Sequence, residues 1–166
     1  MSERFRTIVA AVDFSETSDD AWAAACRLAV DTQSHVHLLH VSPDPLRQPW
    51  TVEAIGVDFA GIAEDWRRKA QGQVAAIRPV AGLPEERITR KVVTGVPHEA
   101  IVDYATAQQA DLIVVGTHGY GPIKHMLLGS VAERVVRQAP CPVMTVPHRS
   151  VGAETREKRN ATQIAS

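Results

Sequence analysis

The chain has 166 residues, 45% of them hydrophobic, with 18 Lys and Arg against 19 Asp and Glu, and a sequence pI of about 6.6. This size and composition allow one domain whose hydrophobic core needs no disulfide or metal to fold. The formal net charge of −1 argues against nucleic-acid binding, because such proteins carry a basic surface that neutralises phosphates.

Cysteine usage and the N-terminal segment indicate the compartment. Cys26 and Cys141 form neither a CxxC pair nor an evenly spaced framework, which favours free thiols in a reducing environment. Met1 to Arg4 lead directly into a strand-like segment, and no apolar run approaches the roughly 20 residues of a membrane span. We therefore expect a soluble cytoplasmic protein without membrane association.

Apolar runs of strand length alternate with helix-length segments along the chain. Strands are predicted at 7–12, 36–41, 88–93, 112–115 and 143–146. Such alternation is typical of the α/β class, here a single doubly wound, Rossmann-like parallel sheet of five strands with helices on both faces.

Helices are predicted between these strands. The first begins near Ser15 or Thr17, and the second carries apolar residues at steps of three or four from Ile55 to Ile77, which we interpret as core packing. The third places Pro97 at its first position, where a missing N–H costs nothing, and the fourth follows Ser130.

Two irregular segments complete the prediction. Residues 42–50 carry three prolines and should lie at the carboxyl edge of the sheet, where they could form a wall of a ligand site. After Pro147 the composition turns polar, so we expect a domain at 1–147 and a flexible tail at 148–166.

The most informative motif joins the fourth strand to the fourth helix. Gly116 ends the buried-strand pattern, Gly119 follows after two residues, and Gly129 with Ser130 follow after nine more. Gly116 and Gly119 lack a Cβ, so the backbone can adopt positive φ and an anion can approach it closely. Residues 130–133 read as a capping box that starts a helix at Ser130, whose first-turn N–H groups favour a phosphate by about 0.3–2 kcal/mol.

This G-x2-G-x9-G-[ST] spacing resembles the motif of the nucleotide-binding members of the universal stress protein family. Residues 8–13 look like the first strand of that family with its terminal Asp, and residues 95–97 and 140–146 also fit, so the resemblance covers roughly 5–147. It implies the sheet order 3-2-1-4-5. Ligands of such sheets bind where the strand order reverses, here between the strands that end at Asp13 and Gly116.

The resemblance further implies that the ligand is ATP, with Mg²⁺ bound through its phosphates. Val41 matches a position whose backbone contacts adenine, and Ala11 and Val115 are small or apolar enough to face a purine. Asp13 would address ribose, adenine or the magnesium; its alternative role is to start the first helix by bonding loop amides. The expected binding residues are Ala11, Asp13, Val41, Val115, Gly116, Gly119, Gly129, Ser130 and Val131.

Several catalytic and metal motifs are missing from the sequence. It has neither a GxxxxGK[ST] phosphate loop nor a GxSxG nucleophile turn. His35 and His37 lie on the opposite strand face from His40, so the three do not converge on a metal. We therefore expect no catalytic residue, no metal held directly by the protein, and at most slow hydrolysis of ATP.

Three functional classes stay open. The first is a cytoplasmic stress-response regulator in which bound ATP stabilises one state of a homodimer, paired through the exposed apolar edge of Val143 to Val146, as the resemblance implies. The second is an ATP-using enzyme of the same fold, with Lys124 or His125 contacting the transition state. The third is a nucleotide-independent interaction module whose glycine loop is only a connector.

Overall fold

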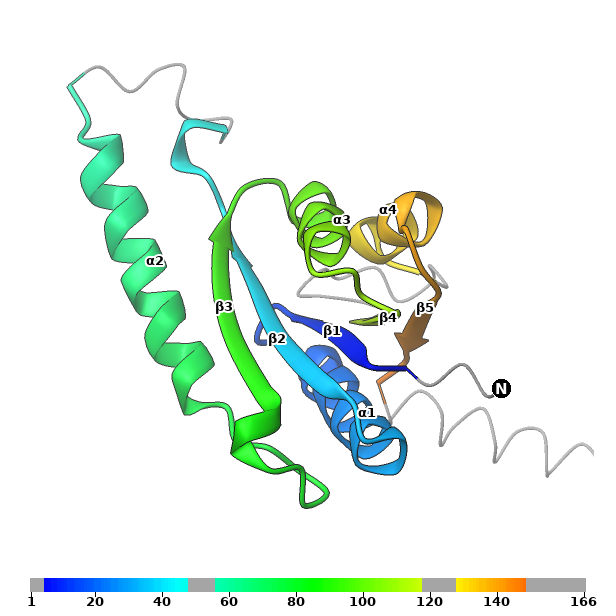
Figure 1. Ribbon diagram of the computed structural model, residues 1–166. Coiled ribbons are helices and arrows are strands. Elements are labelled where there is room, and N and C mark those ends of the chain that lie inside the picture. Colours follow the sequence, from blue (N-terminus) through cyan, green and yellow to red (C-terminus); the bar gives the residue numbers. More distant parts are fainter. Residues whose placement is uncertain (1–4, 48–55, 118–127, 149–166) are drawn as a thin grey trace, which may run out of the picture.

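Five parallel strands form one sheet in the order β3-β2-β1-β4-β5 (Figure 1). The computed structural model describes residues 5–47, 56–117 and 128–148. The strands are β1 (Thr7–Val12), β2 (His35–Ser42), β3 (Ile88–Thr94), β4 (Leu112–Gly116) and β5 (Val143–Val146). The predicted α/β class and strand order are confirmed, and each predicted strand agrees with the observed one to within one residue at either end.

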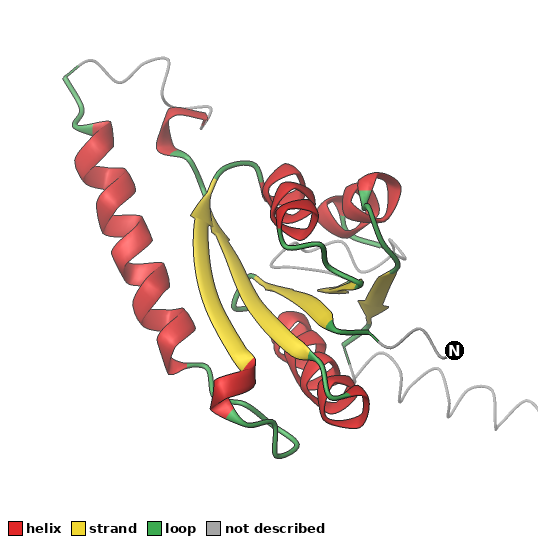
Figure 2. Cartoon of the chain, in the orientation of Figure 1, coloured by secondary structure: helices red, strands yellow, loops and turns green. Residues whose placement is uncertain are grey.

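Helices cover both faces of the sheet, as Figure 2 shows. They are α1 (Glu16–Thr32), α2 (Phe59–Ala76), α3 (Pro97–Ala107) and α4 (Ser130–Gln138), with short 3-10 turns η1 (Pro45–Arg47) and η3 (Glu85–Arg87). The α1 and α2 helices share one hydrophobic cluster with alternate strand residues, and α3 and α4 share a second cluster with the other residues. Strand alternation thus produces two core layers, one on each face.

Local chemistry explains where α1 and α3 begin. The Ser15 hydroxyl caps α1 by accepting from the Ser18 N–H, 3.3 Å away, so this helix begins where predicted. Pro97 is the first residue of α3, also as predicted. At the C-terminus of α1, Gln33 adopts a left-handed conformation, with φ of 60°, and its N–H bonds the Ala29 carbonyl.

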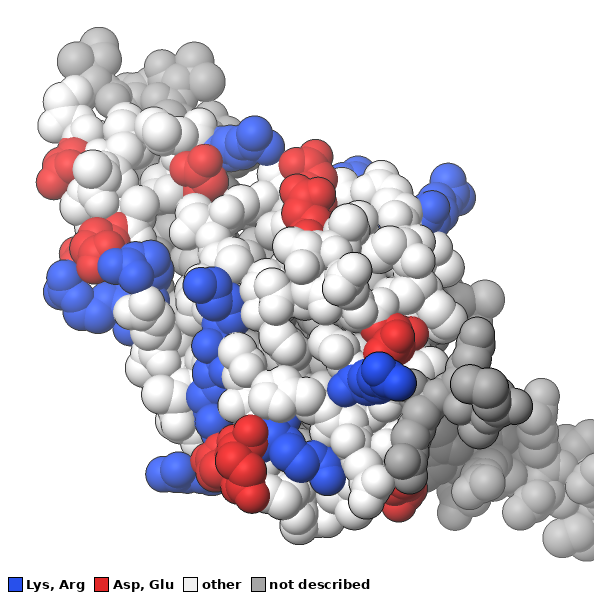
Figure 3. Space-filling view, in the orientation of Figure 1, with Lys and Arg blue, Asp and Glu red and all other residues white. Residues whose placement is uncertain are grey.

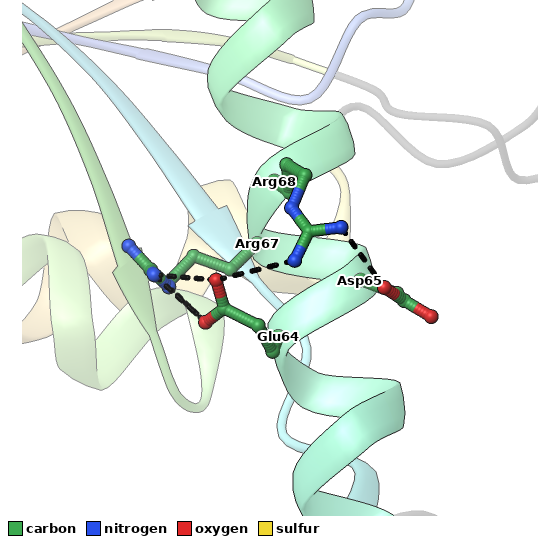
Figure 4. A network of polar contacts seen from close by, with 4 residues as sticks. All are labelled: Glu64, Asp65, Arg67 and Arg68. Carbon is green, nitrogen blue, oxygen red and sulfur yellow. Dashed lines mark hydrogen bonds and ion pairs between the residues drawn. The ribbon is translucent and has the colours of Figure 1, made fainter.

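The long helix α2 packs along the outer strands β2 and β3 and has one face in water. Ala70 and Val74 are buried, while the rest of the described apolar stripe is half-buried, and Ile55 lies outside the described residues. On the outer face Glu64 pairs with Arg67 at 2.7 Å, and Arg68 with Asp65 at 3.6 Å (Figure 4). Exposed pairs at this helical spacing contribute only about 0.3–0.5 kcal/mol each, so this face is a solvated surface.

Charged side chains of both signs are interspersed on the face in Figure 3, over α2, β3 and α3. None of the helices in the described part of the chain combines the length and apolar character required to cross a bilayer. Of the predicted tail only His148 is described; its Nδ1 lies 2.9 Å from Asp20 Oδ2 on α1.

Candidate functional site

The candidate site lies at the carboxyl edge of the sheet, where β1 has β2 on one side and β4 on the other. Ala11 pairs with Val115 of β4 and with Leu39 of β2. Asp13 follows the last residue of β1, and Gly116 is the last residue of β4. Two residues predicted independently to flank the ligand therefore lie on adjacent strands, at the point where the strand order reverses.

Three of the predicted adenine-facing residues share one face of this edge. Val41 and Val115 belong to the hydrophobic cluster under α3 and α4, and Ala11 packs against the same cluster. Val41 and Val115 are 9% and 4% exposed, whereas Ala11 is half-buried. Small and apolar side chains thus line the sheet on the side from which α4 approaches.

The N-terminus of α4 differs from the capping box that the sequence indicated. Gly129, not Ser130, is the N-cap, and it offers no side chain to cap the helix. Ser130 is the first helical residue, and the Glu133 N–H bonds the Gly129 carbonyl at 2.9 Å, while the Glu133 carboxylate pairs with Arg137 at 2.9 Å. The capping-box prediction was wrong because Ser130 lies one position too far into the helix to reach its N3 amide.

The position of this N-cap affects the chemistry of the site. The N–H groups of residues 130–132 have no acceptor within the helix, since the i−4 carbonyls lie before its start. Ser130 and Val131 are exposed there. Among the described residues no side chain caps this helix, so its exposed first turn can donate to an anion, and the helix dipole adds to the attraction.

The N-terminus of α1 has the opposite character. Ser15 already caps it, and carboxylates surround it: burial first, then the neighbouring charges of Asp20, Asp13 and Glu16, raise the pKa of Asp19. A phosphate at the N-terminus of α1 would be repelled by these carboxylates. Of the two helices that follow β1 and β4, α4 therefore has the N-terminus better suited to bind a phosphate.

Asp13 itself interacts locally. Its Oδ1 accepts from the Ser15 N–H at 3.0 Å and from the Ser15 hydroxyl at 2.5 Å, and the residue is exposed. This is the helix-start role that the sequence left open as an alternative. The contacts use Oδ1, and the exposed carboxylate still lies at the edge of the sheet.

The reason for Gly116 is also different from the one expected. The described glycines with positive φ are Gly56, Gly82 and Gly95, so Gly116 does not use the left-handed region. A Cβ at position 116 would lie 2.8 Å from Thr17 Cγ2 and 3.1 Å from both the carbonyl carbon and oxygen of Thr17. Gly116 therefore permits close packing of β4 against the first turn of α1.

Backbone hydrogen bonds connect β5, the end of β4 and the start of α4. The Thr117 N–H donates to the Val146 carbonyl at 2.9 Å, and the Gly129 N–H donates to the Thr117 carbonyl at 2.5 Å. Gly119, the remaining predicted binding residue, lies in 118–127, outside the described residues, as do Lys124 and His125.

The predicted proline-rich wall is described up to Arg47. Ser42 is buried, and its carbonyl accepts from the Gly95 N–H at 3.1 Å, which joins the ends of β2 and β3. Arg47 of η1 lies 3.6 Å from Glu99 in the first turn of α3. This segment lies at the predicted edge, and residues 48–50 are outside the described part.

Sequence reasoning missed the roles of Phe14 and His40. The His40 side chain contacts the residues on either side of Asp13, namely Val12 and Phe14. Phe14 has a φ of 65°, rare for a bulky residue, and its ring lies against that of His40. A signal was available in the sequence: only Phe14 lies between Asp13, predicted at the end of the first strand, and Ser15, predicted at the start of the first helix, so the chain has to turn sharply there.

Sequence comparison relates the chain to a known family of proteins. The model of the Universal stress protein family matches residues 4–147. The chain is 34% identical over 148 residues to the "Universal stress protein in QAH/OAS sulfhydrylase 3'region" of Thermus aquaticus, a match covering 86% of this chain and 98% of that relative.

Solved structures of other proteins have a similar fold. The structure of protein MJ0577 superposes with a TM-score of 0.70 at 25% identity, covering 87% of this chain and 96% of that one. A universal stress protein solved in complex with cAMP gives a TM-score of 0.58 at 27% identity, covering 88% and 99%. The chain belongs to the universal stress protein family.

Proposed function

We propose that this protein binds ATP, with Mg²⁺ held through the phosphates, at the carboxyl edge of β1 and β4. The observation that carries the proposal is the N-terminus of α4 at Gly129 and Ser130, whose N-cap residue has no side chain to cap it and which connects through Thr117 to the end of β4. Donors for an anion and an apolar strip for a base thus belong to the same edge of the sheet.

In this proposal each end of the nucleotide has its own surface. The purine lies toward Ala11, Val41 and Val115, and the phosphates lie against the N–H groups of 130–132, because the Gly129 N–H already donates to Thr117. Gly116, Gly119 and Gly129 of the glycine motif complete the proposed phosphate site. Asp13 addresses the ribose, the adenine or the phosphate-bound magnesium, because direct contact of its carboxylate with a phosphate would be repulsive.

Adenine as the base has support from a relative, since one universal stress protein of similar fold was solved in complex with cAMP. That relative makes a cyclic nucleotide the second candidate. The G-x2-G-x9-G-[ST] spacing and the glycine N-cap of α4 favour a ligand with a chain of phosphates, because these features provide more backbone donors than one cyclic phosphate needs.

The protein would act as a cytoplasmic stress-response regulator, and its hydrolysis of ATP would be slow or absent. An efficient ATPase needs a base or a water-orienting group and strong cationic clamps. Turnover faster than about one per second would favour an enzyme instead.

Isothermal titration tests the ligand. Protein shown to be free of copurified nucleotide is titrated with Mg-ATP, AMP and cAMP. The proposal expects a dissociation constant of about tens of micromolar or tighter for Mg-ATP, or about −6 kcal/mol, and weaker binding of AMP. Tighter cAMP binding would identify the second candidate, and no heat or thermal shift with any of them would leave a nucleotide-independent module.

A substitution at Gly129 tests the phosphate position. Its φ of −70° and ψ of 157° are open to any residue, so a side chain there does not strain the backbone. Gly129→Glu should abolish binding of Mg-ATP through its bulk and charge, with an unchanged circular dichroism spectrum. Gly129→Gln, equal in size but uncharged, is the matched control and should weaken binding less. Full affinity in Gly129→Glu would refute the site.

We also propose a homodimer that pairs through β5. Because Ile113 N–H bonds Pro142 O at 3.0 Å and Thr117 N–H bonds Val146 O at 2.9 Å, the even-numbered residues of β5 bond to β4. Thr145 then turns its N–H toward the open edge. Thr145→Pro removes that donor without breaking the bonds to β4 and should yield a monomer in sedimentation equilibrium. Thr145→Val keeps the N–H and should remain dimeric; a dimeric Thr145→Pro would refute pairing through β5.

A further inference from the structure

His40 is a polar residue inside an otherwise apolar part of β2, on the opposite face from Val41. Leu38 belongs to the α1 and α2 cluster, while Leu39 and Val41 belong to the other, so strand alternation turns His40 toward α1 and α2. Its Nδ1 lies 2.8 Å from the Val12 carbonyl oxygen, the last residue of β1. A carbonyl only accepts, so Nδ1 carries the proton and donates.

The same ring supports the residue that turns the chain after Asp13. The centroids of the His40 and Phe14 rings are 4.2 Å apart, and the ring planes are inclined by 30°. Phe14 has a φ of 65°, which a bulky residue holds only when its surroundings fix it. One imidazole thus contacts the turn twice, through a hydrogen bond before Asp13 and through ring packing after it.

The protonation state of His40 suits this double contact. Burial lowers the pKa of His40 below its usual value, against smaller opposing effects of the Val12 hydrogen bond and the Asp13 charge. The ring is therefore uncharged at neutral pH. An uncharged ring can lie against Phe14 and still donate from Nδ1.

The contacts of His40 fix the backbone that carries the Asp13 carboxylate at the edge of the site. Asp13 is held on one side by its bonds to Ser15, and the backbone on both sides of it is held by His40. The next residue of β2, Val41, lies on the site's apolar face. Adjacent residues of β2 therefore act on the site: Val41 belongs to its apolar face, and His40 fixes the backbone around Asp13.

We propose that His40 is a positioning residue of the nucleotide site, which clamps the turn 12–15 and so holds Asp13 where it meets the ligand. The inference rests on the proposed function for its effect on affinity. The clamp itself is a property of the ligand-free protein, so it can be tested separately.

Two substitutions divide the clamp into its parts. His40→Asn keeps an N–H donor close to the place of Nδ1 but removes the ring, and His40→Phe keeps a ring but removes the donor. A matched control is His35→Asn on the same strand, whose ring bonds Thr89 at 2.8 Å and lies at the far end of β2. All variants are measured for Mg-ATP affinity by titration calorimetry and for stability by urea unfolding.

Loss of one hydrogen bond predicts about threefold to tenfold weaker Mg-ATP binding in His40→Phe, with His40→Asn restored to within about twofold of the unmodified protein. His35→Asn should bind as the unmodified protein does. If His40→Phe binds Mg-ATP with the affinity of the unmodified protein, whether or not it loses stability, His40 has only a structural role and the inference is wrong.

Amide hydrogen exchange without nucleotide gives the independent measurement. His40→Phe should speed exchange of the Ser15 and Ser18 amides by about tenfold, with no change in the central residues of β4. If the unmodified protein binds no nucleotide, the proposed function fails, and exchange still decides on the clamp. If His40→Phe does not fold, the exchange comparison uses His40→Leu, which removes both the ring and the donor, and unchanged exchange of the Ser15 and Ser18 amides there would overturn the proposal.

Discussion

Gly116→Ala measures the close approach of β4 to α1. The added methyl carbon would lie 2.8 Å from Thr17 Cγ2 and 3.1 Å from two backbone atoms of Thr17. Thr17 is 7% exposed in the first turn of α1 and has little room to move. Overpacking of this kind costs about 1–3 kcal/mol, which for a chain of this length lowers the melting temperature by about 2–12 °C.

The assay is urea unfolding together with scanning calorimetry, and two further variants make it specific. Gly72→Ala applies the same change on exposed α2, where nothing lies within 4 Å of the new Cβ, and should stabilise the protein by about 0.5–1 kcal/mol. Thr17→Ser removes the Cγ2 involved in the shortest contact, so it should recover part of the loss when combined with Gly116→Ala. Equal stability of Gly116→Ala and the unmodified protein, or strictly additive effects in the double variant, would refute the steric reasoning.

Two other perturbations have defined outcomes. Ser130→Ala removes one hydroxyl donor to a phosphate and should weaken Mg-ATP binding about 10-fold to 150-fold, measured by titration calorimetry, and an unchanged affinity would place the phosphates elsewhere. Burial, with a smaller contribution from His35, lowers the pKa of His37 below 6.5. The unfolded chain therefore takes up the proton first, and this group's contribution to stability is present above about pH 6.5 and is lost as the pH falls toward the lower folded pKa. His37→Asn should reduce the fall in unfolding free energy between about pH 7.5 and about pH 5; an unchanged pH profile would contradict the assignment.

The fold could be predicted because the apolar patterning of the strands is strong. Residues 112–115 are apolar without interruption, and this is the strand that the structure buries on both sides. The start of α1 at Ser15 and of α3 at Pro97 follows from local chemistry that involves only a few neighbouring residues. Such signals do not depend on distant parts of the chain.

The reasons for particular residues in the site were harder to predict. The sequence predicts that Gly116 allows positive φ and close approach of an anion, but the structure shows that its requirement comes from Thr17, 99 positions earlier in the chain. No local pattern reports that contact. The capping box failed by a single position, because helix boundaries depend on which amide reaches which carbonyl. His40 read only as a failed metal ligand, since its partners Val12 and Phe14 come from another strand and the loop that follows it.

The peptide groups of Thr117 have a further consequence. They bond on one side to Val146, at the end of the edge strand, and on the other to Gly129, at the start of α4. Under the proposed function, a displacement of either neighbour is passed to the other through two hydrogen bonds. Linkage then makes the two events reciprocal: whatever factor nucleotide adds to self-association, self-association adds to the affinity for nucleotide. The protein would therefore report its own concentration together with that of its ligand.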